Sequence, residues 1–214
     1  MSNIFRIYGL KYDGKLVSPY YAKDLKLFCK KGIFPLFMKS TWLLVEVLKD
    51  LDLDRKKILD VGTGTGILAI YCAKHSNAKV LATDIDKKAV RLAKVNAKLN
   101  DVDVTVRHGN LFAPHEGWQF DLVVFNPPYF PLIPSNPHEV SLFAGRNYEV
   151  LRIFLKRLSQ FLQEGSSALL TFSSLLDFSL LKQYIFDYNL QVKTVRSLKG
   201  LPMERIYAFL IRTV

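Results

Sequence analysis

The chain has 214 residues, half of them hydrophobic and 23% charged, which excludes an intrinsically disordered protein and suffices for one large buried core. Its two cysteines, Cys29 and Cys72, stand far apart and no His pair has metal-ligand spacing, so the sequence excludes a disulfide framework and a zinc site. The formal net charge of +11 favours an acidic partner such as RNA or DNA.

The sequence carries no signal for export or for membrane insertion. Its start, MSNIFRIYGLKYDG, lacks the basic-then-apolar order of a signal peptide. No charge-free apolar run reaches the ~18 residues that a membrane span needs. We therefore expect a cytoplasmic protein without membrane contact.

Residues 1–39 are predicted to form a basic N-terminal extension with a small β-hairpin. The segment holds eight Lys or Arg against two Asp, so it carries more than half of the net charge. Asp13-Gly14, a favoured two-residue turn, separates the predicted strands 4–12 and 15–18. Aromatic rings interleave with the cations, a mixture that stacks bases and holds phosphates in nucleic-acid-binding proteins. They include Tyr8, Tyr12, Tyr20, Tyr21 and Phe28. The segment is either a substrate-recognition element or a solvated basic face.

Residues 40–214 are predicted to form one α/β domain. The leading helix has Ser40 or Thr41 as its expected N-cap. Short apolar strands then alternate with helices, which is typical of a doubly wound, mostly parallel sheet covered on both faces. No helix separates the last two strands, so we expect an antiparallel last strand. The seven predicted strands are 57–61, 79–84, 103–107, 121–125, 166–172, 191–198 and 205–212, and the helices between them are 66–75, 86–99, 147–162 and 177–186.

The stretch ILDVGTGTGILAI, residues 58–70, carries the first candidate binding site. Three glycines let the backbone turn sharply and approach a ligand, and the following helix start offers unpaired N–H groups. The dinucleotide fingerprint G-x-G-x-x-G fails by one residue, because its last position is Ile67. The actual pattern, D-x-G-x-G-x-G, places an acid where a cationic ligand such as S-adenosylmethionine (SAM) suits better than a pyrophosphate. A structural turn and another nucleotide are the alternatives, and the candidate residues are Asp60, Gly62, Gly64 and Gly66.

The stretch VLATDID, residues 80–86, supplies a second test of the ligand. Asp84 ends a strand about twenty residues beyond the glycines, where a carboxylate accepts the ribose hydroxyls of an adenosine. This role fits SAM and NAD equally, and an ordinary strand-end Asp is the alternative. Ile85 beside it is expected to border the cofactor, as are Asn110 and Leu111 after the next strand. Asp86 is the predicted N-cap of the following helix.

The stretch VVFNPPYFPLIP, residues 123–134, ends another buried strand with an amide, two prolines and an aromatic ring. In a doubly wound sheet, ligands bind where the strand order reverses. Strands 57–61 and 121–125 are predicted to flank that point, so the glycine turn and Asn126 face one crevice. The alternative is a plain turn, because Asn-Pro and Pro-Pro interrupt regular structure wherever they occur.

The residue types of this stretch suit methyl transfer to a planar nitrogen. A carboxamide or an exocyclic base amine is a poor nucleophile, because its lone pair is delocalised. The side-chain oxygen of Asn126 and the main-chain carbonyl of Pro127 are expected to accept its N–H groups and draw the lone pair out of conjugation. The prolines stiffen the loop, and Tyr129 is predicted to stack on the planar group. Transfer is then a direct displacement at a sulfonium methyl.

Three motifs together resemble a known family. DVGTGTG, TDID and NPPY, in this order and spacing, resemble the class I SAM-dependent methyltransferases, specifically the branch that modifies glutamine amides or base amines. NPPYFP, LFAGRNYEVLRIFLKRL and a closing ERIYAFLIR are most similar to the HemK-type release-factor glutamine methyltransferases in their short archaeal and eukaryotic form. The resemblance implies a Rossmann-like fold, SAM as methyl donor with S-adenosylhomocysteine as product, and a release factor as substrate. It also implies a small zinc-containing activating subunit.

Two positions depart from the family pattern. The family tends to have acidic residues just before the Thr of its leading helix, whereas Lys39 and Ser40 precede Thr41 here. Thr41 is assigned to the cofactor site by this resemblance. After the third strand the family usually has Asp, and this chain has Asn110.

Three functions follow from these observations. The first is a glutamine methyltransferase that acts on a Gly-Gly-Gln segment of a release factor. The second is an RNA or DNA amino-methyltransferase, which the charge of residues 1–39 favours. The third is a non-catalytic SAM-fold binding module. We prefer the first, which NPPY and the following helix support, and we disfavour the third, because every position that the transfer needs is filled.

Overall fold

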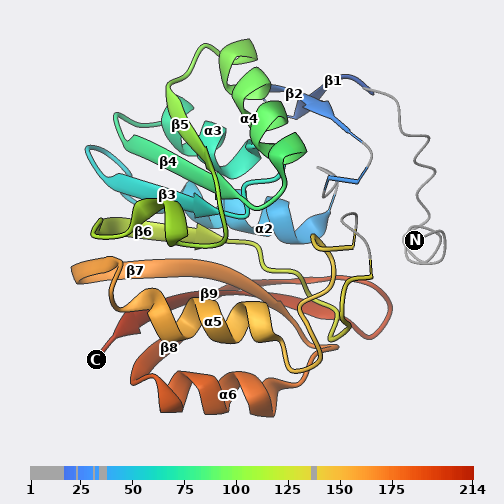
Figure 1. Ribbon diagram of the computed structural model, residues 1–214, viewed down its shortest axis with the longest axis vertical. Helices are drawn as coiled ribbons and strands as arrows, with labels where there is room; N and C mark the ends of the chain where they lie inside the picture. The colour runs from blue at the N-terminus through green and yellow to red at the C-terminus, as the bar shows by residue number, and fades with distance from the viewer. Residues whose placement is uncertain (1–16, 23, 31, 34–37, 136–138) are drawn as a thin grey trace.

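The computed structural model describes residues 17–22, 24–30, 32–33, 38–135 and 139–214, and its main feature is a seven-stranded sheet (Figure 1). The strand order is β5-β4-β3-β6-β7-β9-β8. The first five of these strands run parallel, and β9 is antiparallel to both of its neighbours. The predicted fold class and its antiparallel last strand are confirmed. The strands are β3 (Lys57–Val61), β4 (Lys79–Asp84), β5 (Val104–His108), β6 (Phe120–Phe125), β7 (Leu162–Ser173), β8 (Leu190–Lys199) and β9 (Arg205–Thr213).

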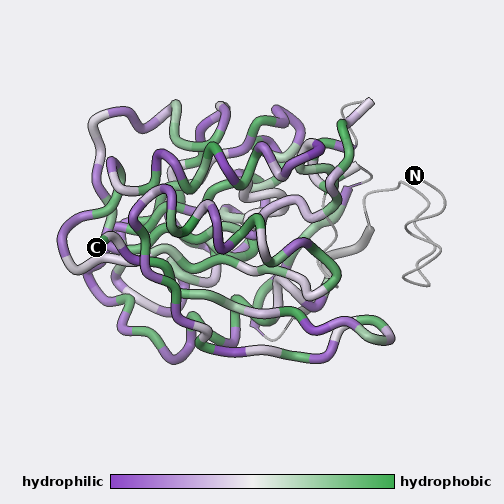
Figure 2. Tube along the Cα trace, turned by 90° about the horizontal axis from the view of Figure 1, so that it is seen from below, coloured by the Kyte–Doolittle hydropathy of each residue, from purple (hydrophilic) through white to green (hydrophobic). Residues whose placement is uncertain are grey.

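Five α-helices are described, and they cover the two faces of the sheet. α2, α3 and α4 pack with β2 into one apolar core, and α5 and α6 pack into a second core on the other face. Figure 2 shows hydrophilic stretches mainly on the outer helices and loops. The central strands are buried on both sides, which explains why their sequences are continuous apolar runs. The helices are α2 (Lys39–Leu48), α3 (Ile67–Lys74), α4 (Lys87–Leu99), α5 (Glu149–Leu158) and α6 (Phe178–Asp187).

Of two predicted helix N-caps, one is confirmed and the other is wrong. The side chain of Asp86 accepts a hydrogen bond from Lys88 N and caps α4, as predicted. α2 instead begins at Lys39 without a side-chain cap, so the prediction of Ser40 or Thr41 as its N-cap was wrong. Both hydroxyls lie inside the first turn, where they accept hydrogen bonds from another part of the chain, described below.

A small antiparallel hairpin precedes the main sheet. β1 (Val17–Ala22) pairs antiparallel with β2 (Leu25–Cys29), and Ala22 lies opposite Leu25. The Asp13-Gly14 turn and strand 4–12 lie outside the described residues. Three side chains of β2, those of Leu25, Leu27 and Cys29, are buried in the same core as α2 to α4.

α4 holds β2 through two side-chain amides. The carboxamide of Asn100 accepts a hydrogen bond from Lys26 N and donates one to the Lys26 carbonyl. The carboxamide of Asn96 makes the same pair of bonds with Phe28. It also donates to the carbonyl of Thr65 in the loop of residues 62–66 between β3 and α3, which we call the glycine loop. Four residues of helix rise ~6 Å and two residues of strand ~6.6 Å, so the amides match the repeat of the strand.

Helices long and apolar enough to cross a membrane are absent from the described parts of the chain.

Candidate active site

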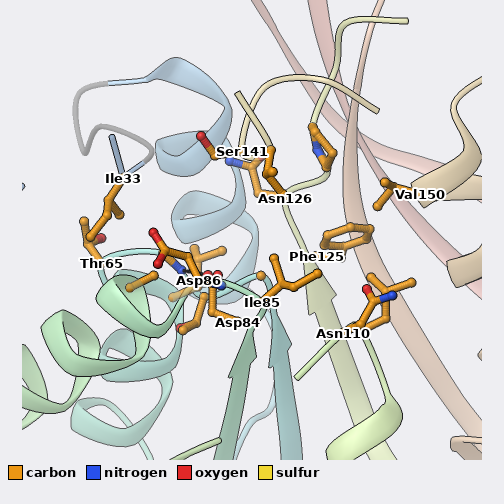
Figure 3. A pocket seen from close by; sticks show the side chains of 18 of the residues that line it. Ile33, Thr65, Asp84, Ile85, Asp86, Asn110, Phe125, Asn126, Ser141 and Val150 are labelled. Atoms are coloured by element: carbon orange, nitrogen blue, oxygen red, sulfur yellow. Dashed lines mark hydrogen bonds between the residues drawn. The ribbon is translucent and has the colours of Figure 1, made fainter. Parts of the chain in front are cut away.

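A pocket opens at the carboxyl ends of the parallel strands, where the strand order reverses between β3 and β6 (Figure 3). The loops after β3, β4, β5 and β6 all contribute to its lining. This is the position that the doubly wound architecture predicts for a ligand. Eight of the predicted site residues line it, namely Thr41, Gly62, Gly64, Asp84, Ile85, Asn110, Leu111 and Asn126.

The glycine loop forms the floor of the pocket. Gly62 and Gly64 line the pocket and have φ of +65° and +57°, in the left-handed region that glycine adopts without strain. Gly66 does not line it. A Cβ on Gly66 would lie 3.1 Å from Ala93 Cβ, so this glycine allows α3 to pack closely on α4. The third glycine of the motif therefore serves the packing of α3 on α4 and not the pocket lining.

Asp60 lies beneath the loop and outside the pocket lining. Its Oδ2 accepts hydrogen bonds from Thr63 Oγ1 at 2.6 Å and from Ala69 N at 3.3 Å, so the side chain ties the loop to α3. Its Oδ1 is buried without a hydrogen-bond partner among the described residues. Burial raises the pKa of Asp60 to about 7, against the lowering effect of the bonds from Thr63 and Ala69.

The raised pKa of Asp60 predicts a pH-dependent stability. The unfolded carboxyl ionises near pH ~3.9 while the native one keeps its proton to about pH 7, so the free energy of unfolding falls as the pH rises through this window. The slope is on the order of 1 kcal/mol per pH unit and vanishes above the folded pKa. Denaturant unfolding of the wild type and of Asp60→Asn at several pH values measures it. The stability advantage of Asp60→Asn is expected to grow between pH ~5 and ~7, and parallel pH profiles would contradict the assignment.

The carboxylate of Asp84 stands at the edge of the pocket, fixed by the backbone on two sides. Its Oδ2 accepts from Gly64 N at 2.8 Å and its Oδ1 from Asp86 N at 2.9 Å. Burial raises its pKa above the usual value, although both backbone bonds oppose this shift. Ile85 and Leu111 line the same pocket. A carboxylate acceptor between apolar side chains fits the hydroxyls and the flat base of a nucleoside.

Asn126 is held by four hydroxyl groups, which we call the hydroxyl cage: Ser40, Thr41, Tyr129 and Thr171. Nδ2 of Asn126 donates to Ser40 Oγ at 3.3 Å and to Thr41 Oγ1 at 3.2 Å. Oδ1 accepts from Thr171 Oγ1 at 2.7 Å, and Tyr129 OH lies within hydrogen-bond distance of the same oxygen at 3.2 Å. The cage fixes both ends of the amide at the pocket lining.

The prolines and the tyrosine of NPPY lie behind or beside Asn126. Pro128 lines the pocket, whereas Pro127 and Tyr129 are buried and do not. The Tyr129 side chain is turned into the protein, and its hydroxyl contacts Asn126 and Thr171. These contacts of the Tyr129 hydroxyl were not predicted, and the stacking of the ring on a substrate stays a prediction.

Several residues of the site were missed by sequence reasoning. Ser40 and Thr171 belong to the hydroxyl cage, and Ile33, Phe125 and Ser141 line the pocket. The one signal in the sequence was a Thr inside the apolar run of β7, because a hydroxyl in such a run needs a buried polar partner. Thr171 is fully buried in the structure.

The comparisons with known proteins agree on a methyltransferase. Residues 25–172 match the methyltransferase small domain family. A putative protein N5-glutamine methyltransferase from Methanocaldococcus jannaschii is 39% identical over 137 residues, which cover 60% of this chain and 68% of that protein. A release factor glutamine methyltransferase from Deinococcus radiodurans is 36% identical over 143 residues, 62% of this chain and 51% of that enzyme. The match thus spans about half the length of the bacterial relative.

A solved structure with a similar fold is the Mtq2–Trm112 complex from E. cuniculi, described as responsible for methylation of the eRF1 translation termination factor. Its matched chain superposes with a TM-score of 0.65 at 17% identity, over 86% of this chain and 99% of that one. The likeness concerns the fold alone. The family match covers more than half of the chain and contains both the glycine loop and Asn126. The chain therefore belongs to the methyltransferase small domain family, and it is a SAM-dependent methyltransferase.

Proposed function

We propose that the protein transfers a methyl group to the side-chain amide nitrogen of a glutamine in a translation release factor. The observation that carries this proposal is Asn126, an amide held at the pocket by four hydroxyls. The names of the archaeal and bacterial relatives support the same substrate.

The chain's residues divide into a cofactor half and a substrate half. Asp84 is proposed to accept the ribose hydroxyls, with Ile85 and Leu111 against the base. SAM supplies a methyl group on a sulfonium, which is already electrophilic. The proposed task of Asn126 Oδ1, and of the Pro127 carbonyl next to the pocket-lining Pro128, is to accept the two N–H groups of the glutamine amide, which moves the nitrogen lone pair out of conjugation. The nitrogen would lose one of these protons once methylated, and S-adenosylhomocysteine would be the leaving group.

The segment after NPPY also contributes to the substrate half of the pocket. Val140 and Ser141, on the segment after NPPY, line the pocket beside Asn126. We propose that this segment borders the glutamine side chain. The protein is proposed to act in the cytoplasm with a small activating subunit, which the resemblance implies contains zinc. The neighbour with a similar fold was solved as a complex of two proteins, which supports such a partner.

The experiment that tests the function uses labelled SAM. The protein is incubated with a purified release factor and, in parallel, with a variant of that factor whose Gly-Gly-Gln glutamine is replaced. Incorporation of the label into the first protein and not the second is expected. Equal labelling of both would refute the proposed residue, and labelling of cellular RNA alone would favour the second candidate.

That second candidate, an RNA amino-methyltransferase, is favoured by a row of cations on α4. Lys87, Arg91, Lys94 and Lys98 are exposed and lie within an arc of about 60° around the helix. We call these four residues the α4 stripe. Among the described residues none of them makes an ion pair. Like charges four residues apart destabilise a helix, and so do cations in its first turn, which suggests a role outside stability.

Salt dependence distinguishes an RNA-binding stripe from a solvated face. If the stripe contacts phosphates, affinity for RNA falls steeply between ~50 and ~200 mM salt, and changing all four residues to Gln flattens this dependence. Fluorescence anisotropy with a labelled RNA measures both. The matched control changes four exposed lysines elsewhere, Lys156, Lys182, Lys193 and Lys199, and removes the same charge. Equal losses in the two variants would show that only net charge matters.

A further inference from the structure

The hydroxyl cage has more contacts than hydrogens on one side of Asn126. Three oxygen atoms, Asn126 Oδ1, Tyr129 OH and Thr171 Oγ1, are all within hydrogen-bond distance of one another. The two hydroxyls have one hydrogen each, and the amide oxygen has none. Three contacts therefore share two hydrogens, and one contact carries no full hydrogen bond.

The distances indicate which contact is left without a hydrogen. Thr171 lies 2.7 Å from Asn126 Oδ1, and the Tyr129 and Thr171 hydroxyls are in still closer contact. Tyr129 to Asn126, at 3.2 Å, is the longest of the three. Thr171 has one hydrogen and donates it to Asn126 over the shorter distance, so in its contact with Tyr129 it can only accept and Tyr129 is the donor. This arrangement leaves one lone pair of Asn126 Oδ1 available as an acceptor.

We infer that Tyr129 and Thr171 are positioning residues that act as a relay on Asn126. The relay fixes the amide oxygen with one acceptor site occupied by Thr171 and the other open to a substrate N–H. This inference rests on the proposed function, in which Asn126 accepts that N–H. Tyr129 then contributes through its hydroxyl and through Thr171, rather than through its ring on the substrate.

The sheet gives the relay a rigid base. Phe125, the last residue of β6, pairs with Leu170 of β7, so Asn126 directly after β6 lies beside Thr171. On its other side Thr171 pairs with Ala208 of β9. Thr171 is fully buried and Tyr129 is 8% exposed, so water competes little for these bonds.

A double-mutant cycle tests the relay. Thr171→Val keeps the shape of the side chain and removes its hydroxyl, and Tyr129→Phe does the same for the tyrosine. Each single variant is expected to lower kcat about tenfold, the effect of losing one hydrogen bond. The double variant is expected to be no slower than the slower single variant, because both changes break the same relay. KM and SAM affinity change by less than about threefold, and Thr171→Ser restores most of kcat.

The matched control is Ser173→Ala. Ser173 is two residues further along the same face of β7 and equally buried, but its hydroxyl donates to Glu204 instead of Asn126. This variant is expected to lose stability and to keep kcat. Multiplicative losses in the double variant, or a normal kcat for Thr171→Val, would overturn the relay. If Asn126→Ala were also fully active, the proposed function would fail with it, whereas an inactive Asn126→Ala beside an active Thr171→Val would remove the relay alone.

Discussion

Asn126→Ala is expected to lower kcat by ~10²–10³-fold, the range for removing one preorganised polar contact from a reacting group. The contact strengthens as the lone pair of the substrate nitrogen localises, so its loss raises the transition state more than the ground state. SAM affinity is expected to stay within a few fold, because Asp84 and the glycine loop are untouched. Single-turnover kinetics with a verified substrate, together with a SAM titration, separate the two effects.

Asn126→Asp is the sharper companion variant. It keeps an acceptor oxygen and adds a charge, and the Ser40 and Thr41 hydroxyls that now accept from Nδ2 are able to rotate and donate. Partial activity is expected from it. Near-normal turnover of Asn126→Ala would mean that NPPY is only a turn in this protein.

Asp84→Ala is expected to weaken SAM binding by about 10- to 100-fold, the effect of losing a charged hydrogen-bonding partner. The substitution removes the proposed ribose acceptor, and it also frees the backbone N–H groups of Gly64 and Asp86 that the carboxylate fixes. Isothermal titration measures the affinity directly. The rise in melting temperature at a fixed SAM concentration shrinks in parallel, because this rise depends on the ratio of ligand concentration to Kd.

Asp177→Ala is the matched control for Asp84→Ala. It removes the same charge from a carboxylate that caps α6 and does not line the pocket. We expect it to lower stability through loss of the cap and to leave SAM affinity within about threefold. NAD is expected not to raise the melting temperature of the wild type. Stabilisation by NAD equal to that by SAM would contradict the cofactor assignment at this site.

The sequence was sufficient for those parts of the site that local chemistry determines. Glycines at positive φ, an Asp at the end of β4 and the Asn-Pro-Pro run each have a conformational cause within a few residues of the chain. The reversal of strand order then places them at one pocket, because the carboxyl ends of parallel strands share one edge. The order of the motifs was therefore enough to predict which of them meet.

The parts that failed depend on contacts between distant segments. Thr171 is forty-five residues from Asn126, and only the register of β6 on β7 brings the two together. Ser40 and Thr41 were predicted as helix caps because capping depends only on neighbouring residues. Their hydroxyls instead accept hydrogen bonds from Asn126, which is more than eighty residues away in the sequence. Sequence reasoning also did not foresee the contact between the Tyr129 hydroxyl and Thr171 on another strand, and the stacking of the Tyr129 ring on a substrate stays a prediction.

The amides of Asn96 and Asn100 change how the beginning of the chain should be regarded. On the far side of β2 from its hairpin partner, they stand in for a neighbouring strand, and one of them also bonds to the glycine loop. Both side chains are buried, at 0% and 8% exposure. A chain shortened to begin at residue 40 would lose the four hydrogen bonds between these carboxamides and β2, each worth about 0.5–1.5 kcal/mol, and would expose the core that Leu25, Leu27 and Cys29 cover. In engineering terms the hairpin is bonded to the same Asn96 that bonds to the glycine loop, so it cannot be exchanged or removed as an independent module.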